Sequence, residues 1–318
     1  MCKIDISNEI IKGHFLSRTD NLDFLLTTEL SCLCDGADLI RRHFCGDHVD
    51  LCSIINGRSG RCSENCKFCA QSAHHNTSVE EYAFLSPDEI VEDGKYHEAA
   101  GVHRYSIVTA GRSLEGKDLD TAILSYGRLA RESRIKLCAS HGLLSDEAFV
   151  KLKNAGVDRY HANIETSRRN FPNICTTHTY QDKCENIRRA QKAGLEICSG
   201  GIIGMGETWA DRIDMALDLS EMCVESIPLN ILQPIPGTPY ADLPPLSEED
   251  ILRTIAIFRY LNPAADIRLA AGRIMMSDSG QKAFQSGANA TITGDMLTTS
   301  GNNIAQDKTM LTEMGFSI

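Results

Sequence analysis

Three cysteines stand in one short run of the chain, and their spacing suits an iron–sulfur cluster. Cys62, Cys66 and Cys69 form a CxxxCxxC pattern. Iron–sulfur clusters are held by cysteine thiolates, and a loop with three thiolates leaves one iron of a four-iron cubane without a protein ligand. A cluster with such an open iron could bind and reduce a small molecule rather than only relay electrons.

A zinc ion is the alternative to an iron–sulfur cluster in this loop. A zinc site normally takes four protein ligands, often as two CxxC pairs, and neither a second CxxC nor an HxxxH follows the loop. His74 and His75 lie close behind it, so zinc stays open as an alternative. The pattern as a whole favours a three-thiolate iron–sulfur loop.

Size and charge narrow the class of protein. The chain has 318 residues, of which 42% are hydrophobic, so it can bury a large core and is within the size of a single α/β barrel. Its formal charge of −11 argues against a nucleic-acid groove, since phosphate binding requires clustered lysine and arginine. We therefore expect one domain and no nucleic-acid partner.

The distribution of apolar residues and the number of cysteines indicate in which cellular compartment the protein works. No stretch approaches the roughly 18 consecutive apolar residues of a membrane span, and the N-terminus has no secretory apolar segment. Thirteen cysteines in such a chain are typical of metal ligands or reactive thiols in a reducing compartment. We expect a cytoplasmic protein without membrane contact.

Short apolar runs alternate with longer amphipathic stretches along most of the chain. This rhythm predicts parallel βαβ units after an N-terminal helical segment at 9–42. Ala-Gly pairs before several runs mark helix ends, and no dinucleotide fingerprint follows the first run. We predict a (β/α)8 TIM-type barrel over 49–318 with an N-terminal helical extension at 1–48, an open doubly wound sheet being the alternative. The expected strands are 50–55, 104–109, 136–140, 159–163, 196–203, 226–232, 266–270 and 290–292.

In such a barrel, functional residues lie at the carboxyl ends of the strands, and the cysteine loop follows the first strand. This arrangement resembles the radical S-adenosylmethionine (SAM) superfamily. The resemblance implies a [4Fe-4S] cluster whose open iron binds the amino and carboxylate groups of SAM. Reductive cleavage of SAM would then yield a 5′-deoxyadenosyl radical, while the protein provides position and excludes water.

A longer set of segments, from about Asp50 to Phe316, resembles the biotin synthase family. Several long matches in order are more specific than any single motif. The segments are Ala70–Ser72, Tyr160–Ser167, Ile174–Gln181, Cys198–Thr208, Pro228–Leu232, Pro236–Pro239, Ile267–Arg273 and Gly287–Asn289. The family reaction inserts sulfur from an auxiliary iron–sulfur cluster between C6 and C9 of dethiobiotin.

The resemblance implies roles for residues that would bind SAM. Asn163 and Glu165 match residues that bind its ribose, and a carboxylate suits vicinal hydroxyls because it accepts two hydrogen bonds. Small residues in the Cys198–Thr208 segment would let the backbone approach adenine. Within that segment we assign cofactor binding to Gly200, Gly201 and Ile203.

Other matches imply contacts to the substrate. Asn230 corresponds to the residue that binds the ureido ring of dethiobiotin, since a carboxamide donates and accepts at once. Asn163 would also approach the substrate. His161 stands where the family usually has asparagine, and His178 where it has an arginine that can meet the SAM carboxylate; both are expected near these ligands.

The auxiliary cluster is where the sequence departs from the family. Cys138, Cys198 and Arg268 match three of its four ligands, but the fourth position holds Ser106. A hydroxyl is a poor ligand for iron–sulfur chemistry. Cys52, on the neighbouring first strand, is expected to replace it, in a two-iron or four-iron auxiliary cluster. Cys32, Cys34 and Cys45 are further thiols, expected to be structural or solvent-facing, with a cluster role as the alternative.

The resemblance also implies partners, and alternative activities remain to be compared with it. A flavodoxin or ferredoxin would supply electrons, and a homodimer is expected by analogy. Another radical SAM enzyme of the same branch, such as a hydrogenase-cluster maturase or a carbon-skeleton mutase, is the alternative activity. A non-catalytic iron–sulfur carrier or zinc-stabilised binding protein is the alternative from another class.

Overall fold

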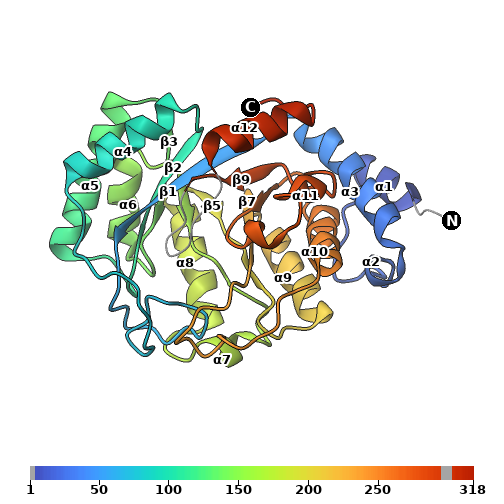
Figure 1. The fold of residues 1–318 in the computed structure, drawn as a ribbon, viewed down its shortest axis with the longest axis horizontal. Helices are drawn as coiled ribbons and strands as arrows, with labels where there is room; N and C mark the ends of the chain where they lie inside the picture. The colour runs from blue at the N-terminus through green and yellow to red at the C-terminus, as the bar shows by residue number, and fades with distance from the viewer. Residues whose placement is uncertain (1–3, 295–302) are drawn as a thin grey trace.

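The computed structural model describes residues 4–294 and 303–318, and its strands form one parallel sheet that closes on itself (Figure 1). The strands are β1 (Asp50–Arg58), β2 (Arg104–Thr109), β3 (Lys136–Ser140), β4 (Arg159–His161), β5 (Glu196–Cys198), β6 (Gly201–Ile203), β7 (Ser226–Ile231), β8 (Asp266–Leu269) and β9 (Ala290–Ile292). They neighbour one another in the order β5-β4-β3-β2-β1-β9-β8-β7-β6, and a β5–β7 pairing closes the ring. The predicted (β/α)8 barrel is therefore confirmed.

The predicted strand 196–203 is divided into two. Cys198 pairs with Ser226 and Gly201 with Leu229, so the register along β7 continues across the break. The backbone N–H of Gly200 donates to the side-chain oxygen of Asn163 (3.0 Å). A side-chain oxygen thus takes the place of a backbone acceptor between β5 and β6, which together occupy one strand position of the eight-stranded barrel.

Helices surround the strands and connect successive ones (Figure 1). They are α1 (Ile4–Ile11), α2 (Phe24–Thr27), α3 (Leu30–Cys45), α4 (Pro87–Ala99), α5 (Gly116–Glu132), α6 (Asp146–Asn154), α7 (Phe171–Ile174), α8 (Tyr180–Lys192), α9 (Trp209–Glu221), α10 (Glu248–Leu261), the 3₁₀ turn η1 (Arg273–Met275), α11 (Gln281–Phe284) and α12 (Ile304–Glu313). Capping boxes begin α4, α8 and α9, so the loops before them end at defined residues.

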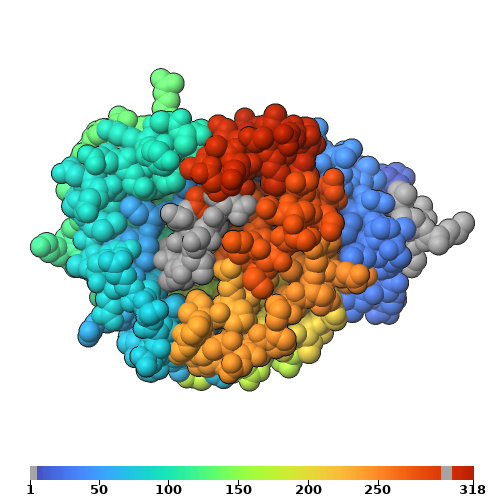
Figure 2. All heavy atoms as spheres, in the orientation of Figure 1, coloured from blue at the N-terminus to red at the C-terminus, as the bar shows by residue number. Residues whose placement is uncertain are grey.

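The N-terminal segment is three helices rather than the single helical stretch predicted at 9–42. Gly13 adopts φ 101°, a value that favours glycine, and a turn follows in which Asp20 accepts a hydrogen bond from the backbone of Ser17 (2.8 Å). The third helix, α3, packs along α10 at one end of the molecule (Figure 2). A bond between the Ser7 and Tyr260 hydroxyls (2.8 Å) joins the extension to the barrel.

No helix in residues 4–294 or 303–318 is long and apolar enough to cross a membrane.

Candidate functional site

The interior of the barrel holds a cavity of about 330 Å³, and each of the strands β1 to β9 contributes to its wall. Alternate residues of a strand share one face, and Arg104, Ser106 and Val108 of β2 follow this rule. The volume lies within the range of small-molecule sites. Further lining residues are Cys52, Ile54, Phe68, Cys138, Ser140, Arg159, His161, Asn163, Glu165, Cys198, Ile202, Pro228, Asn230 and Arg268.

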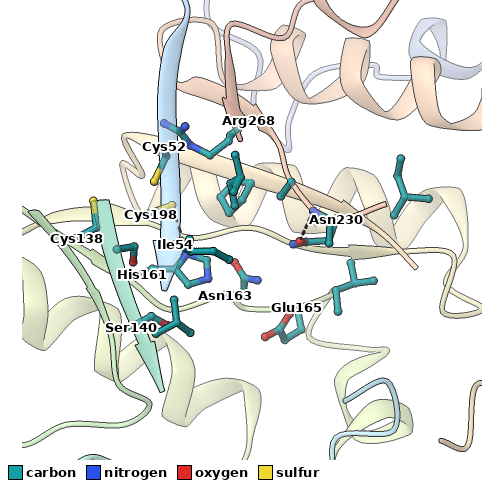
Figure 3. A pocket seen from close by; sticks show the side chains of 18 of the residues that line it. Cys52, Ile54, Cys138, Ser140, His161, Asn163, Glu165, Cys198, Asn230 and Arg268 are labelled. Carbon is teal, nitrogen blue, oxygen red and sulfur yellow. Dashed lines mark hydrogen bonds between the residues drawn. The ribbon is translucent and has the colours of Figure 1, made fainter. Parts of the chain in front are cut away.

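Three thiols from different strands meet at the floor of this cavity (Figure 3). Cys52 is on β1, Cys138 on β3 and Cys198 on β5, and all are buried. Ser106, on β2 between the first two, is buried and lines the same space. The thiol of Cys52 interacts with that of Cys138 across β2. The tertiary structure thus brings together the three cysteines expected at an auxiliary cluster, with Cys52 beside the serine it is expected to replace.

Arg268 lies at the same floor and is held by the protein. Its Nη2 donates to Asp50 Oδ2 (2.6 Å), Nη1 to the carbonyls of Asp50 (3.1 Å) and Thr291 (2.9 Å), and Nε to Ser226 Oγ (3.3 Å). Burial alone would raise the pKa of Asp50, but Arg268, with contributions from His103 and Arg104, holds it well below its usual range. Asp50 is therefore a fixed anion that orients Arg268.

The surroundings of the three thiols affect their ionisation unequally. Contact with Cys138 and then burial raise the pKa of Cys52, whereas the hydrogen bond from Cys52 lowers the pKa of Cys138. Burial raises the pKa of Cys198. The Nδ1 atom of His161 lies 3.4 Å from the sulfur of Cys198, and burial lowers the pKa of this imidazole, which favours its neutral form. Metal ligation requires thiolates, so a bound metal would have to displace these protons.

Polar side chains form the opposite wall, at the carboxyl ends of β4 and β7 (Figure 3). Asn163 accepts a bond from the backbone of Gly200, as described above. Glu165 has a φ of 68°, which is rare for a residue with a side chain. Its Oε2 atom is buried without a hydrogen-bond partner. Buried polar atoms normally have partners, so Glu165 offers an unused acceptor to a ligand in the cavity.

The two glycines of the SAM-binding prediction have a structural reason of their own. A Cβ at Gly200 would lie 2.0 Å from the carbonyl oxygen of Pro228, and one at Gly201 would lie 2.4 Å from that of Glu165. Glycine is therefore required here by close approach of neighbouring strands, whether or not a ligand is bound. Ile203 is fully buried outside the cavity wall, and its neighbour Ile202 lines the wall instead.

Asn230 lines the cavity and also joins two strand ends. Its Nδ2 donates to the carbonyl of Gly201 (3.1 Å), and its Oδ1 accepts from the backbone N–H of Ala271 (3.1 Å). One N–H and one lone pair of the carboxamide are left for a ligand. The backbone therefore orients the side chain that the sequence assigns to substrate recognition.

The CxxxCxxC loop lies between β1 and α4, at the carboxyl end of β1. Backbone bonds from Cys62 to Gln71 (2.9 Å) and from Cys69 to Cys66 (3.0 Å) shape the loop, and all three cysteine residues are half-buried. Burial raises the pKa of Cys69 to about 11. Phe68, within the loop, lines the cavity. The loop therefore borders the same space as the three buried thiols.

A fourth thiol near this loop was missed by the sequence analysis. Ligand atoms of Cys66, Cys175 and His178 all lie within 4.8 Å of one another. Glu64 Oε2 lies 2.5 Å from Nδ1 of His178, and Cys175 Sγ lies 3.3 Å from the same nitrogen. This imidazole does not line the cavity. The Cys-x-x-His spacing at 175–178 was the available signal, because such pairs often ligate metals.

Three of the remaining cysteines lie outside the cavity wall. Cys34 and Cys45 lie on α3, outside the barrel, together with Cys32. The sulfur of Cys45 accepts a bond from Nη1 of Arg259 (3.3 Å). The position of α3 favours the structural role expected for these residues.

Comparison with known proteins places this site in a family. Residues 58–219 match the radical SAM superfamily, and residues 228–317 match the Biotin and Thiamin Synthesis associated domain. The chain is 64% identical to biotin synthase of Alkaliphilus metalliredigens (98% of each chain) and 64% identical to that of Clostridium beijerinckii (98% of this chain, 99% of the relative). It is 54% identical to biotin synthase of Akkermansia muciniphila, over 98% of this chain and 97% of that one.

Solved structures confirm the fold. A methylornithine synthase superimposes with a TM-score of 0.85 at 20% identity, covering 98% of this chain and 96% of the other. The FeFe-hydrogenase maturase HydG from Carboxydothermus hydrogenoformans gives 0.79 at 17% identity, covering 98% and 79%. At these identities the likeness concerns the fold alone, whereas the curated relatives decide between the rival activities. The chain belongs to the biotin synthase family of radical SAM enzymes.

Proposed function

We propose that this enzyme converts dethiobiotin to biotin with sulfur taken from an auxiliary cluster at the floor of its barrel. The observation that carries the proposal is that one cavity is lined by Cys52, Cys138 and Cys198, by Asn230 and by Phe68 of the cluster loop. When bound, a [4Fe-4S] cluster with SAM supplies a hydrogen-abstracting radical, and the auxiliary cluster supplies sulfur. The protein must hold SAM, the substrate and the auxiliary cluster in an orientation that allows hydrogen abstraction and sulfur transfer.

Cys62, Cys66 and Cys69 would hold the radical-generating cluster, because they share one short loop at the carboxyl end of β1. Glu165 would accept hydrogen bonds from the ribose of SAM, since its Oε2 atom is buried without a partner. Asn163 would assist on the same strand end. The segment from Gly200 through Gly201 to Ile203 would present backbone to the adenine. His178, whose Nε2 is also buried without a partner, remains our candidate for contact with the SAM carboxylate.

The auxiliary cluster would be held by Cys52, Cys138 and Cys198 with Arg268. Soft thiolates suit iron–sulfur chemistry, and these three buried thiols line one space, so the donor set fits the group. Cys52 would supply the thiolate that Ser106 cannot.

Dethiobiotin would lie between the floor and the loop. Asn230 would recognise its ureido ring with the N–H and lone pair left over from its two backbone bonds. Asn163 and the neutral His161 would contact the substrate from β4. Apolar neighbours such as Ile54 and Val108 line the same wall, which would exclude water from the reacting carbons.

Three further features complete the proposal by analogy to the family. A flavodoxin or ferredoxin would reduce the radical cluster, and the active form would be a homodimer. Cytoplasmic operation would suit the buried free thiols of the cavity, because reducing compartments preserve them.

Anaerobic reconstitution with iron and sulfide tests this function. Iron and sulfide counting with Mössbauer spectroscopy should reveal two clusters, and reduction with SAM and dethiobiotin should yield biotin. A single cluster, or SAM cleavage without sulfur insertion into dethiobiotin, would contradict the proposal.

A further inference from the structure

Two arginines at the floor of the cavity each have a buried nitrogen without a hydrogen-bond partner. Arg104, on β2, and Arg159, on β4, both line the cavity beside the three thiols. The Nη1 atom of each is buried and makes no hydrogen bond. In the strand register, Arg104 pairs with Cys52 and Arg159 with Cys138, so each arginine is the cross-strand neighbour of a floor thiol.

The other guanidinium nitrogens of these residues face acidic side chains: Nη2 lies 3.0 Å from Glu196 Oε2 in Arg159 and 3.6 Å from it in Arg104. Arg104 Nε donates to Asp50 Oδ2 (3.0 Å), and Arg159 Nε donates to Glu196 Oε2 (3.0 Å). The Nη1 atom of Arg159 lies 3.6 Å from Asp266 and 3.9 Å from Asp50, beyond hydrogen-bonding distance. The acidic residues therefore hold the two guanidinium groups in place by ion pairing but leave one nitrogen of each without a hydrogen bond.

Arg268 differs from its two neighbours in this respect. All three of its guanidinium nitrogens donate to protein acceptors. A buried donor without a hydrogen bond costs free energy, and native proteins keep such donors rare. The Nη1 atoms of Arg104 and Arg159, buried without a hydrogen bond, therefore mark the place of a hydrogen-bond acceptor that the protein itself does not provide, next to the three thiols.

We propose that Arg104 and Arg159 bind an anionic sulfur, a sulfide or hydrosulfide, at the three-thiol floor. This inference rests on the proposed function, and it assigns the two arginines as positioning residues for the sulfur to be transferred. Charge-assisted hydrogen bonds from guanidinium groups hold anions strongly. The thiols select a soft metal centre, and the arginines then neutralise the extra negative charge that a sulfide brings to it.

A carboxylate of the substrate is the other anion that two arginines could bind. The thiols argue against it, because Cys52, Cys138 and the arginines occupy the same end of the cavity, where the proposed cluster would lie. Sulfide and substrate carboxylate lead to different expected results in the variants below. If the arginines bind a carboxylate, their loss would weaken dethiobiotin binding and leave the sulfide content unchanged.

The test compares Arg159→Met and Arg104→Met with the wild type after anaerobic reconstitution. Acid-labile sulfide and iron are counted, and Mössbauer spectra are recorded, so the readout does not depend on turnover. Both variants should keep auxiliary iron but lose sulfide per iron, with altered auxiliary spectra. Arg159→Lys, which keeps the charge, should lose less. Cleavage of SAM by the loop should persist in all of them.

Glu196→Gln is the matched control, because it breaks the Arg159–Glu196 ion pair but keeps the guanidinium group. It should retain the wild-type ratio of sulfide to iron. If Glu196→Gln loses sulfide as much as Arg159→Met does, or if neither arginine variant changes the ratio, the inference is wrong. Weaker dethiobiotin binding with an unchanged ratio of sulfide to iron would instead identify the substrate carboxylate as the ligand of the arginines. That result would also overturn the inference. Absence of auxiliary iron from the wild type would refute the proposed function itself, and this inference with it.

Discussion

The two thiol sites of this enzyme are built in opposite ways. Cys62, Cys66 and Cys69 share one loop, are partly exposed, and depend on backbone bonds within that loop. The floor site takes one buried thiol from each of β1, β3 and β5. Ligands that share one loop have a fixed spacing, so none of them can be moved without rebuilding the loop. A ligand on a barrel strand, in contrast, can be replaced by a residue on the next strand that faces the same space.

Their electrostatic surroundings also differ. The floor thiols lie beside three arginines that are held by buried or half-buried acids, chiefly Asp50. The loop thiol Cys66 lies beside Cys175 and His178, the latter paired with Glu64. A positive floor would suit a site that carries added sulfide, while a loop of three thiolates would leave one iron open for SAM. The predictions below separate the two sites.

The largest expected effect is at the loop. Cys66→Ala should abolish reductive cleavage of SAM, because the cluster needs all three thiolates, while the fold is retained since the barrel core does not depend on this loop. Formation of 5′-deoxyadenosine measures the first effect and circular dichroism the second. Cys175→Ala, which removes the nearby fourth thiol, should still cleave SAM. Cleavage that survives in Cys66→Ala would refute the ligand assignment.

At the floor, Cys52→Ala should remove auxiliary iron and biotin formation yet spare SAM cleavage, because the two sites share no ligand. Iron counting and product analysis measure this result, and Cys45→Ala serves as the control thiol outside the barrel. A Cys52→Ala enzyme that still makes biotin would show that the ligand has not moved to β1. The double variant Cys52→Ser, Ser106→Cys sharpens the comparison: it should regain auxiliary iron, because both positions face the same space.

Between the two sites, Asn230→Ala should weaken dethiobiotin binding by about 1–3 kcal/mol, or roughly 5- to 150-fold in Kd, because buried urea groups lose their partner. A binding titration measures the change, and SAM cleavage uncoupled from substrate should persist. Asn173→Ala, outside the cavity wall, is the control. Unchanged affinity would remove Asn230 from the substrate site.

The smallest effect concerns the framework near both sites. His141 is fully buried between Thr109 and Tyr126, and burial lowers its pKa from 6.5 to about 3. Its stabilising contribution is therefore complete above pH 6.5 and decreases as the pH falls, because the unfolded chain then binds the proton. Between pH 7 and pH 5.5 the loss should be about 1 kcal/mol.

Urea unfolding at several pH values measures this slope, with His141→Gln as the comparison variant. In that variant the part of the slope due to this imidazole should disappear. An identical pH dependence in both proteins would show that the histidine is not held neutral in the folded state.

Much of the fold was predictable because its signals are local. Apolar runs at regular intervals predicted the strand positions of the barrel, although several strands end elsewhere than predicted, such as β1 at Arg58 and β4 at His161. The larger differences are the division of 196–203 and the break in the N-terminal helical segment. Those differences lie at a side-chain bond between Asn163 and Gly200 and at a turn after Gly13. Neither has a periodic pattern by which a sequence could reveal it.

The sequence by itself determined the loop of three cysteines, the class of barrel and the family, because spacing and ordered motifs are properties of the chain. Only the tertiary structure decided that Cys175 lies beside Cys66, that Glu165 keeps an oxygen without a hydrogen bond, and that Arg104 and Arg159 each keep such a nitrogen. The reason is physical: contacts between residues on separate strands and loops depend on closure of the barrel, and burial of a polar atom is defined only once every neighbour is in place.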